Sequence, residues 1–258
     1  MVDNIKEKIK KAGWDFPEQI FDLISNYDKN FIVSEFTGLK TLDYYHQRIN
    51  CLGFVDMNNV LDAACGMGQW SIALSLENKK VNGIDINVGR LLIADSVIRK
   101  MKIKNCNLQW GNIEDLPYPS EIFDGIFCYG SFMFANMPKT LMEFNRVLKP
   151  GGTLYLNANS VGWYLHLLFD RGIKKNNFSN VRTVIKTLTR NLFQKKSKIV
   201  VFSHWINKLL QNKGFQIISS GAEGEINISN VLEKPQSAYP KTFYSFPAVL
   251  EILAKKND

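Results

Sequence analysis

Short apolar runs alternate with amphipathic stretches between residues 59 and 156 of this 258-residue chain. The apolar runs have strand length and the stretches between them repeat with helical period, which predicts strands at 60–64, 80–84, 106–110, 123–128 and 153–156 and helices at 70–77, 91–101 and 140–148. Strands that alternate with helices pair in parallel through right-handed crossovers. The pattern therefore predicts a doubly wound α/β sheet with helices on both faces.

The flanking regions have different patterns. Residues 1–50 read as amphipathic helices, and residues 161–200 interrupt the alternation, whereas a helix at 204–212 and a strand at 215–219 resume it. We therefore predict an N-terminal helical cap or lid (1–50), a ligand-binding core (51–160), a basic helical insertion acting as an acceptor lid (161–200), and a C-terminal part that completes the sheet (201–258).

The connection after the first strand reads VLDAACGMGQWS and carries Gly66 and Gly68. Glycine permits a sharp turn and a close approach of the backbone to a ligand, and ligands of doubly wound sheets lie beyond the carboxyl ends of the strands. Asp85 ends the second strand, 23 residues after Asp62, where a carboxylate can accept hydrogen bonds from ribose hydroxyls. Asn112 follows the third strand and can accept from an adenine amino group.

Four segments occur in a fixed order: VLDAACGMG, GIDI, GNIEDLPYPSEIFDGIFC and FNRVLKPGGTLYL. As a set they resemble the class I S-adenosylmethionine-dependent methyltransferases, over about residues 55–160. The resemblance implies a Rossmann-like, mostly parallel seven-stranded sheet, with a helical cap before it and a helical insertion after the fifth strand. It also implies S-adenosylmethionine (SAM) as cofactor, S-adenosylhomocysteine as product and no metal. A nicotinamide-binding Rossmann domain is the rival interpretation, but RVLKPGG has no counterpart there.

By this resemblance the cofactor-binding residues are Asp62, Ala64, Gly66, Gly68, Asp85, Ile86, Asn112, Ile113 and Cys128. The first four line the methionine end and Asp85 holds the ribose. Ile86 lies against the adenine, and Asn112 and Ile113 hold its edge. Ala64 stands where the family has glycine, and Asn112 stands where it has aspartate. Each departure is expected to weaken the affinity for SAM.

Methyl transfer depends mainly on positioning, although a hydroxyl acceptor also needs a general base. His166 and Tyr129 are the candidate bases, and a buried core role is the competing interpretation for both. The loops beyond the fourth and fifth strands and the N-terminal segment supply the candidate acceptor-binding residues, which are Tyr45, Arg48, Ser131, Met133, Asn157 and Asn159.

Positive charge concentrates in the insertion. The net charge is +8, and residues 171–198 hold nine lysines and arginines without an acid. A solvated basic helix face explains this equally well as an anionic acceptor, an anionic membrane surface or nucleic acid. The tetrapeptide [DNS]PP[YFW] of amino-directed nucleic-acid methyltransferases is missing, since the fourth strand ends in CYGS.

We therefore expect methylation of the oxygen or nitrogen of a small polar acceptor of a sugar-like or phosphorylated, anionic kind. The alternatives are an RNA methyltransferase that uses the basic insertion, which we favour less, and a non-catalytic binding protein with the same fold.

Composition also bears on whether the protein binds zinc, spans a membrane or is secreted. The four cysteines match no zinc or redox spacing, and no run approaches the roughly 18 apolar residues of a membrane span. The first fifteen residues are charged and amphipathic, unlike a signal peptide. We therefore expect a cytoplasmic protein without a membrane span.

Overall fold

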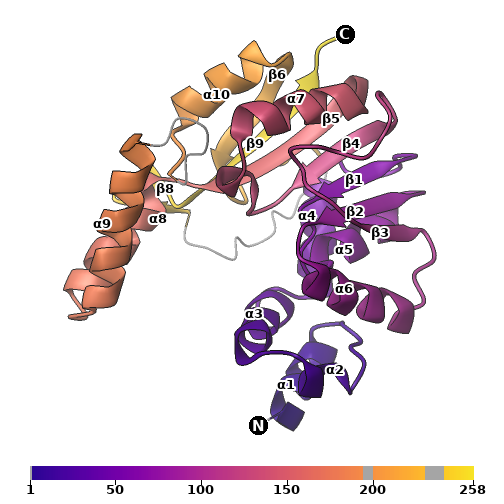
Figure 1. Cartoon of the computed structure of the whole chain (residues 1–258), viewed down its shortest axis with the longest axis horizontal. Coiled ribbons are helices and arrows are strands. Elements are labelled where there is room, and N and C mark those ends of the chain that lie inside the picture. The colour runs from indigo at the N-terminus through magenta and orange to yellow at the C-terminus, as the bar shows by residue number, and fades with distance from the viewer. Residues whose placement is uncertain (1, 194–199, 230–240) are drawn as a thin grey trace. The chain divides into compact units, whose positions relative to one another are not determined.

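A seven-stranded sheet organises the chain (Figure 1). The computed structural model describes residues 2–193, 200–229 and 241–258. The strand order is β3-β2-β1-β4-β5-β9-β6, with β1 (Val60–Ala63), β2 (Val81–Asp85), β3 (Cys106–Trp110), β4 (Phe123–Cys128), β5 (Leu148–Asn159), β6 (Phe215–Ala222) and β9 (Val249–Lys256). β1 pairs with β2, β2 with β3 and β4 with β5 in parallel, whereas β9 runs antiparallel to both β5 and β6. The predicted Rossmann-like, mostly parallel sheet is confirmed.

The strand positions follow the hydrophobic pattern closely. Two strands, β3 and β4, have the predicted bounds, whereas β1 ends one residue earlier than predicted and β2 is shifted by one residue at both ends. The fifth strand is longer than predicted because it begins at Leu148 and includes the PGG turn. The pattern missed β9, although six of its eight residues are buried. A fully buried run shows no alternation that would mark it as a strand.

Two compact units make up the described chain. The first contains residues 2–112 with 228 and 229, and the second contains residues 113–193, 200–227 and 241–258. The predicted boundaries at residues 50, 160 and 200 remain predictions.

The first unit carries β1, β2 and β3 and six helices: α1 (Val2–Lys11), α2 (Ile20–Leu23), α3 (Asn26–Phe36), α4 (Leu42–Cys51), α5 (Gln69–Glu77) and α6 (Val88–Lys100). Ser25 separates α2 from α3, because its side chain accepts a hydrogen bond from the backbone N–H of Asp28 and caps the start of α3. The aromatic core of α1–α4 centres on Trp14, whose ring meets Phe36 at 4.9 Å and Tyr45 at 5.5 Å edge to face.

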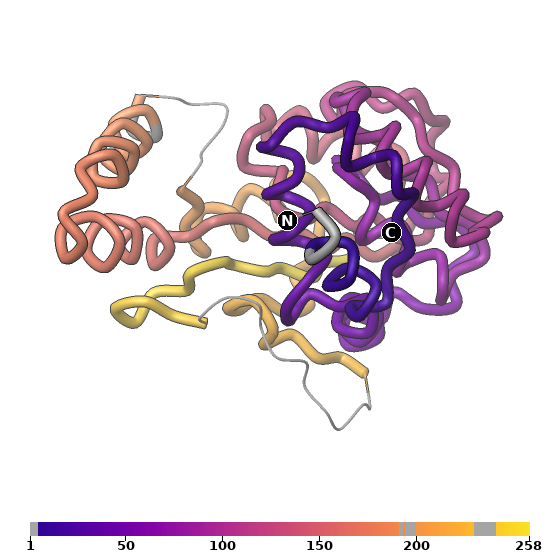
Figure 2. Tube along the Cα trace, turned by 90° about the horizontal axis from the view of Figure 1, so that it is seen from below, coloured from indigo at the N-terminus to yellow at the C-terminus, as the bar shows by residue number. Residues whose placement is uncertain are grey.

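The second unit carries the other strands of the sheet, a hairpin of β7 (Thr242–Phe243) and β8 (Phe246–Pro247), and the remaining helices. These are η1 (Phe132–Phe134), α7 (Met137–Val147), α8 (Val161–Leu165), the π-helix η2 (His166–Ile173), α9 (Phe178–Phe193) and α10 (Ser203–Asn212). The helical segment expected after the fifth strand is thus present as α8, η2 and α9. Figures 1 and 2 both show it to one side of the strands of its unit.

Candidate cofactor and acceptor sites

The loop between β1 and α5 turns on three left-handed residues. Ala64, Gly66 and Gly68 have φ angles of 63°, 57° and 82°. A Cβ added to Gly66 would meet no atom within 4 Å, whereas one on Gly68 would lie 2.9 Å from the Cβ of Ala94 on α6. The two glycines therefore serve different needs, because Gly68 permits helix packing while Gly66 leaves its backbone facing open space.

Asp85 at the end of β2 is locked against this loop. Its Oδ2 accepts a hydrogen bond from the Gly66 amide at 2.9 Å, and its Oδ1 accepts from the Asn87 amide at 2.8 Å. The carboxylate is 7% exposed. Each carboxylate oxygen can accept a further bond, so Asp85 is both fixed in place and able to receive ribose hydroxyls.

Asp62 lies on β1, two residues before this loop. It is buried, and its Oδ2 accepts a hydrogen bond from the Ser71 hydroxyl at 2.6 Å. Burial raises the pKa of Asp62 to about 7, with a smaller contribution from the nearby charge of Asp85 and an opposing one from Ser71. A cation bound beside Asp62 would favour its ionised form.

Two further features of the first unit suit a nucleoside with a charged amino-acid tail, and sequence reasoning missed both. Gln69 begins α5 and its Oε1 is buried without a hydrogen-bond partner, which leaves an acceptor for a ligand N–H group. Trp110 donates from Nε1 to the Ile86 carbonyl at 3.1 Å, and both side chains are largely exposed. Together they offer an apolar surface beside Asp85. Gln69 lies within VLDAACGMGQWS but was not singled out there, and Trp110 lies in no quoted motif; the burial of Gln69 and the exposure of Trp110 reveal them.

These observations fit SAM. The open space at Gly66 lets the cofactor approach the bare backbone. The unpaired oxygen of Gln69 can accept from the cofactor's ammonium group, and the fixed carboxylate of Asp85 can accept from its ribose hydroxyls. Asn112 ends the first unit as a half-exposed residue that takes part in further interactions. Ile113 opens the second unit and is buried. The assignment of these residues to SAM remains a prediction.

The second unit collects polar side chains where β4, β5 and β6 end. The Tyr129 hydroxyl donates to Oε1 of Glu223, a buried residue just after β6. The buried Asn157 of β5 accepts from the Gly130 amide at 2.5 Å through Oδ1. Sequence reasoning proposed Tyr129 and Asn157 but missed Glu223, which lies 94 residues from its partner and in no motif.

Other predicted residues of this unit differ in exposure. Cys128 and Met133 are buried, while Ser131 and Asn159 are half-buried. Burial raises the pKa of the Tyr164 hydroxyl, and a hydrogen bond between the Tyr164 and Asn159 side chains opposes that rise. His166 on η2 pairs through Nδ1 with Oδ2 of Asp170 at 3.1 Å and stacks on Phe243 at 4.0 Å. The histidine thus has a packed, hydrogen-bonded environment, and a role as base remains a prediction.

Tyr45 and Arg48, the candidate lid contacts, are both about 1% exposed on α4. The Tyr45 hydroxyl donates to the Glu35 carbonyl oxygen at 2.8 Å, and its ring meets Trp70 at 4.5 Å. Both residues therefore belong to the core of the first unit. Contact of either with an acceptor remains a prediction.

Hydrogen bonds from the ion pair of Arg146 and Glu143, which we call the clamp, join the segment FNRVLKPGG to the segment GNIEDLPY. Arg146 donates to the carbonyl oxygens of Leu116 at 2.9 Å and Tyr118 at 2.7 Å, and Glu143 accepts from the Leu116 amide at 2.8 Å. The hydrogen bond from Arg146 lowers the pKa of Glu143. The motif around Arg146 thus holds the loop that follows Ile113.

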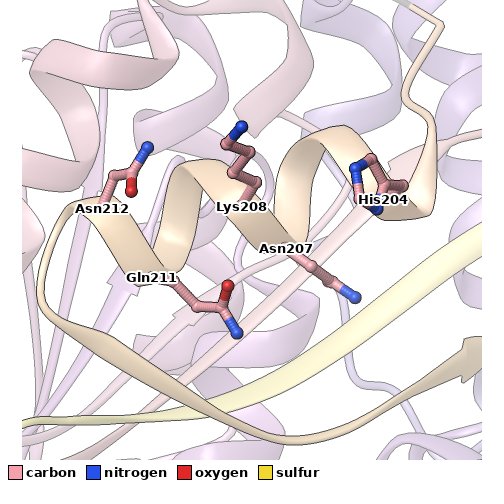
Figure 3. Close-up of a pocket in the computed structure, with 5 residues that line it drawn as sticks. All are labelled: His204, Asn207, Lys208, Gln211 and Asn212. Atoms are coloured by element: carbon pink, nitrogen blue, oxygen red, sulfur yellow. The ribbon is translucent and has the colours of Figure 1, made fainter.

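A separate pocket lies on α10, lined by His204, Asn207, Lys208, Gln211 and Asn212 (Figure 3). All five come from one helix, and none is a predicted site residue. In the part of the chain that the structure describes, no group of three or more His, Cys, Asp or Glu side chains could hold a metal ion. No helix among the same residues is long and apolar enough to span a bilayer.

Comparisons with known proteins agree with this geometry. Residues 55–200 match the family described as "Methyltransferase domain". A demethylmenaquinone methyltransferase of Alkalihalophilus pseudofirmus is 37% identical over 101 residues, 37% of this chain and 42% of the relative. One from Listeria welshimeri is 30% identical over 175 residues, 63% and 69% of the two chains. Alignments to the first two such relatives span only 42% and 56% of their lengths.

Solved structures share the fold. A crystal structure of an S-adenosylmethionine-dependent methyltransferase from Clostridium acetobutylicum has a TM-score of 0.61 at 16% identity, and the match covers 91% of this chain and all of the other. A SAM-dependent methyltransferase from Aquifex aeolicus has a TM-score of 0.55 at 17% identity, with 93% and 98% covered. The glycine loop, the fixed Asp85 and the family match lead to one conclusion: this chain belongs to the class I SAM-dependent methyltransferases.

Proposed function

We propose that this chain transfers the methyl group of SAM to a small-molecule acceptor, and that the acceptor is a demethylated quinone of the kind named for its relatives. The observation that carries the proposal is the loop at Gly66, where open space adjoins an amide held by Asp85. The quinone rests on the names of the curated relatives. It replaces the sugar-like acceptor that composition suggested.

The first unit would bind the cofactor. Asp85 would accept the ribose hydroxyls, the exposed Ile86 and Trp110 would cover the adenine, and Gln69 would accept from the ammonium group. When bound, SAM would supply a methyl group already activated by its sulfonium. The protein's remaining task is to hold the acceptor in line and to remove a proton.

The second unit offers a proton acceptor for this task. Glu223 is buried and receives the Tyr129 hydroxyl. In its reduced form a demethylated quinone carries ring hydroxyls, and loss of a hydroxyl proton makes the ring electron-rich enough to attack a methyl group. We assign that proton to the pair formed by Tyr129 and Glu223: Tyr129 would receive it while passing its own proton to the Glu223 carboxylate, so that Glu223 becomes neutral and the negative charge lies on the acceptor ring. After the ring carbon has gained the methyl group, its hydrogen would leave as a proton that restores the ring hydroxyl, and Glu223 would release its proton to solvent.

A matched pair of tyrosines tests this assignment. Tyr129→Phe and Glu223→Gln should lower kcat by about 10²–10⁴-fold while leaving the affinity for SAM unchanged. Tyr155, which donates to the buried Glu251 at 3.1 Å, provides the control. Tyr155→Phe removes a similar buried hydroxyl and should leave kcat within a few-fold. Equal losses of kcat in Tyr129→Phe and Tyr155→Phe would contradict the assignment.

The transfer of a labelled methyl group from SAM to different acceptors distinguishes the possible functions. The purified chain should transfer labelled methyl to a reduced, short-chain demethylated quinone in preference to phosphorylated sugars or total RNA. Label in RNA would favour the nucleic-acid alternative, and label in the sugars would restore the polar acceptor. Calorimetry with SAM distinguishes the non-catalytic alternative, for which no heat of binding is expected.

A further inference from the structure

The positive charge of this chain resides in one segment. Residues 171–198 hold nine of the 32 lysines and arginines and none of the 24 acids, so the rest of the chain has 23 basic against 24 acidic residues. Six of the nine are described, namely Arg171, Lys174, Lys175, Arg182, Lys186 and Arg190, while Lys195, Lys196 and Lys198 lie outside the described residues. The net charge of +8 is therefore a local feature.

One side of α9 anchors it to its own unit. Val184 is buried in a cluster with Tyr164 and Val200. Gly172 of η2 lies so close that an added Cβ would be 2.8 Å from the Val181 side chain. The helix is thus held by one face, and its opposite face is open to solvent.

The open face is apolar as well as basic. Phe178, Ile185 and Phe193 are 79%, 57% and 80% exposed. Residues 178 and 185 lie about 20° apart around a helix, and positions 182, 186 and 190 form an adjoining stripe. This stripe consists of Arg182, Lys186 and Arg190, which are exposed and form no ion pair within the described residues.

Neighbouring elements extend the apolar surface. Ile173 at the end of η2 is 54% exposed, and Phe169 of the same helix contacts the exposed ring of Tyr244 at 5.6 Å between centroids. Lys174 follows and pairs with Asp170 at 2.6 Å. We call the exposed side chains of α9, η2 and Tyr244 the basic apolar face.

Three kinds of partner could cover such a face, and its chemistry favours one. A second copy of this chain would bring like charges together. A nucleic-acid interface is polar and contacts phosphate, which leaves Ile173, Ile185 and Phe178 without a role. A helix with bulky apolar residues beside lysine and arginine suits the headgroup boundary of an anionic bilayer, where both kinds of side chain are satisfied.

We propose that the basic apolar face docks on the surface of an anionic lipid bilayer. Phe178 and Ile185 enter the boundary between headgroups and acyl chains, while Arg182, Lys186 and Arg190 contact the lipid phosphates. The proposal does not depend on the proposed acceptor, because docking requires neither SAM nor methyl transfer.

Vesicle sedimentation with the full chain tests the proposal. Vesicles of phosphatidylcholine with about a third phosphatidylglycerol should bind the protein, and pure phosphatidylcholine vesicles should bind it far more weakly. Each basic residue at an anionic surface contributes about five-fold in affinity. The triple variant Arg182→Gln, Lys186→Gln, Arg190→Gln should therefore bind about 100-fold more weakly.

A matched variant controls for net charge. Lys8→Gln, Lys10→Gln, Lys100→Gln removes the same charge from exposed positions on α1 and α6 and should retain wild-type vesicle binding. Phe178→Ser with Ile185→Ser should lower binding by at least ten-fold while keeping all the charge. Because every altered side chain is exposed, circular dichroism should be unchanged in each variant.

A direct measurement of depth completes the test. In Phe178→Trp, brominated lipids should quench additional fluorescence relative to the wild type, because the new indole enters the bilayer boundary. Equal binding to both vesicle types, equal losses in the two triple variants, or binding to RNA without binding to vesicles would each overturn the proposal.

Discussion

Replacing Asp62 with asparagine should change how the stability of this protein depends on pH. In the fold, Asp62 is buried beside Ser71 and Asp85, and burial raises its pKa to about 7. In the unfolded chain an aspartate has a pKa of about 4. The folded protein therefore binds this proton more tightly than the unfolded chain does.

The sign and size of the effect follow from linkage. Below about pH 4 the carboxyl is protonated in both states and its ionisation costs nothing. As pH rises from about 4 to 7 only the folded state keeps the proton, so the free energy of unfolding falls by about 1.4 kcal/mol per pH unit. Above pH 7 the loss is complete, at about 4 kcal/mol in order of magnitude. Asparagine can still accept from Ser71 and does not ionise.

Urea unfolding between pH 4.5 and 8, followed by fluorescence and circular dichroism, measures this loss. The free energy of unfolding of Asp62→Asn minus that of the wild type should rise with pH up to about 7 and then level off. Asp56→Asn, which alters an exposed carboxylate of the same unit, should run parallel to the wild type. Parallel curves for Asp62→Asn as well would refute the reasoning, because they would mean that Asp62 ionises in the fold at no cost.

The glycine loop gives further predictions. Ala64→Gly should raise the free energy of unfolding by about 0.5–1 kcal/mol, since φ 63° strains alanine, and thermal melts would detect it. Gly68→Ala should destabilise by roughly 1–3 kcal/mol more than Gly66→Ala, because only its Cβ meets Ala94 at 2.9 Å. Gly66→Ala should instead lower the SAM affinity measured by calorimetry more than ten-fold. Asp85→Ala should abolish measurable SAM binding while the protein stays folded, and wild-type affinity would show that the ribose contact is misassigned.

Much of the fold can be predicted from short stretches of the sequence. The parallel strands follow from apolar runs of strand length. The tight loop follows from Gly66 and Gly68, because the ability to adopt a positive φ is a property of glycine itself. The antiparallel β9 could not be predicted in this way. Its burial arises from pairing with β5 and β6, strands that lie far from it in the sequence.

Some residues of the candidate site could also be predicted from the local sequence, and others could not. Short motifs indicated Asp62 and Asp85, and the predicted end of the fifth strand indicated Asn157. The pairing of Tyr129 with Glu223, in contrast, joins residues 94 positions apart. Likewise the unsatisfied oxygen of Gln69 depends on what surrounds it.

By itself, the sequence determined the class of fold, the turn that opens the cofactor loop and the concentration of positive charge in residues 171–198. The tertiary structure alone decided that Asp62 is buried, that Arg146 clamps the loop after Ile113, and that Ile185 of α9 is exposed. The physical reason is that turn geometry and periodicity depend on neighbours in the chain. Burial, pKa and exposure depend on atoms brought close by packing.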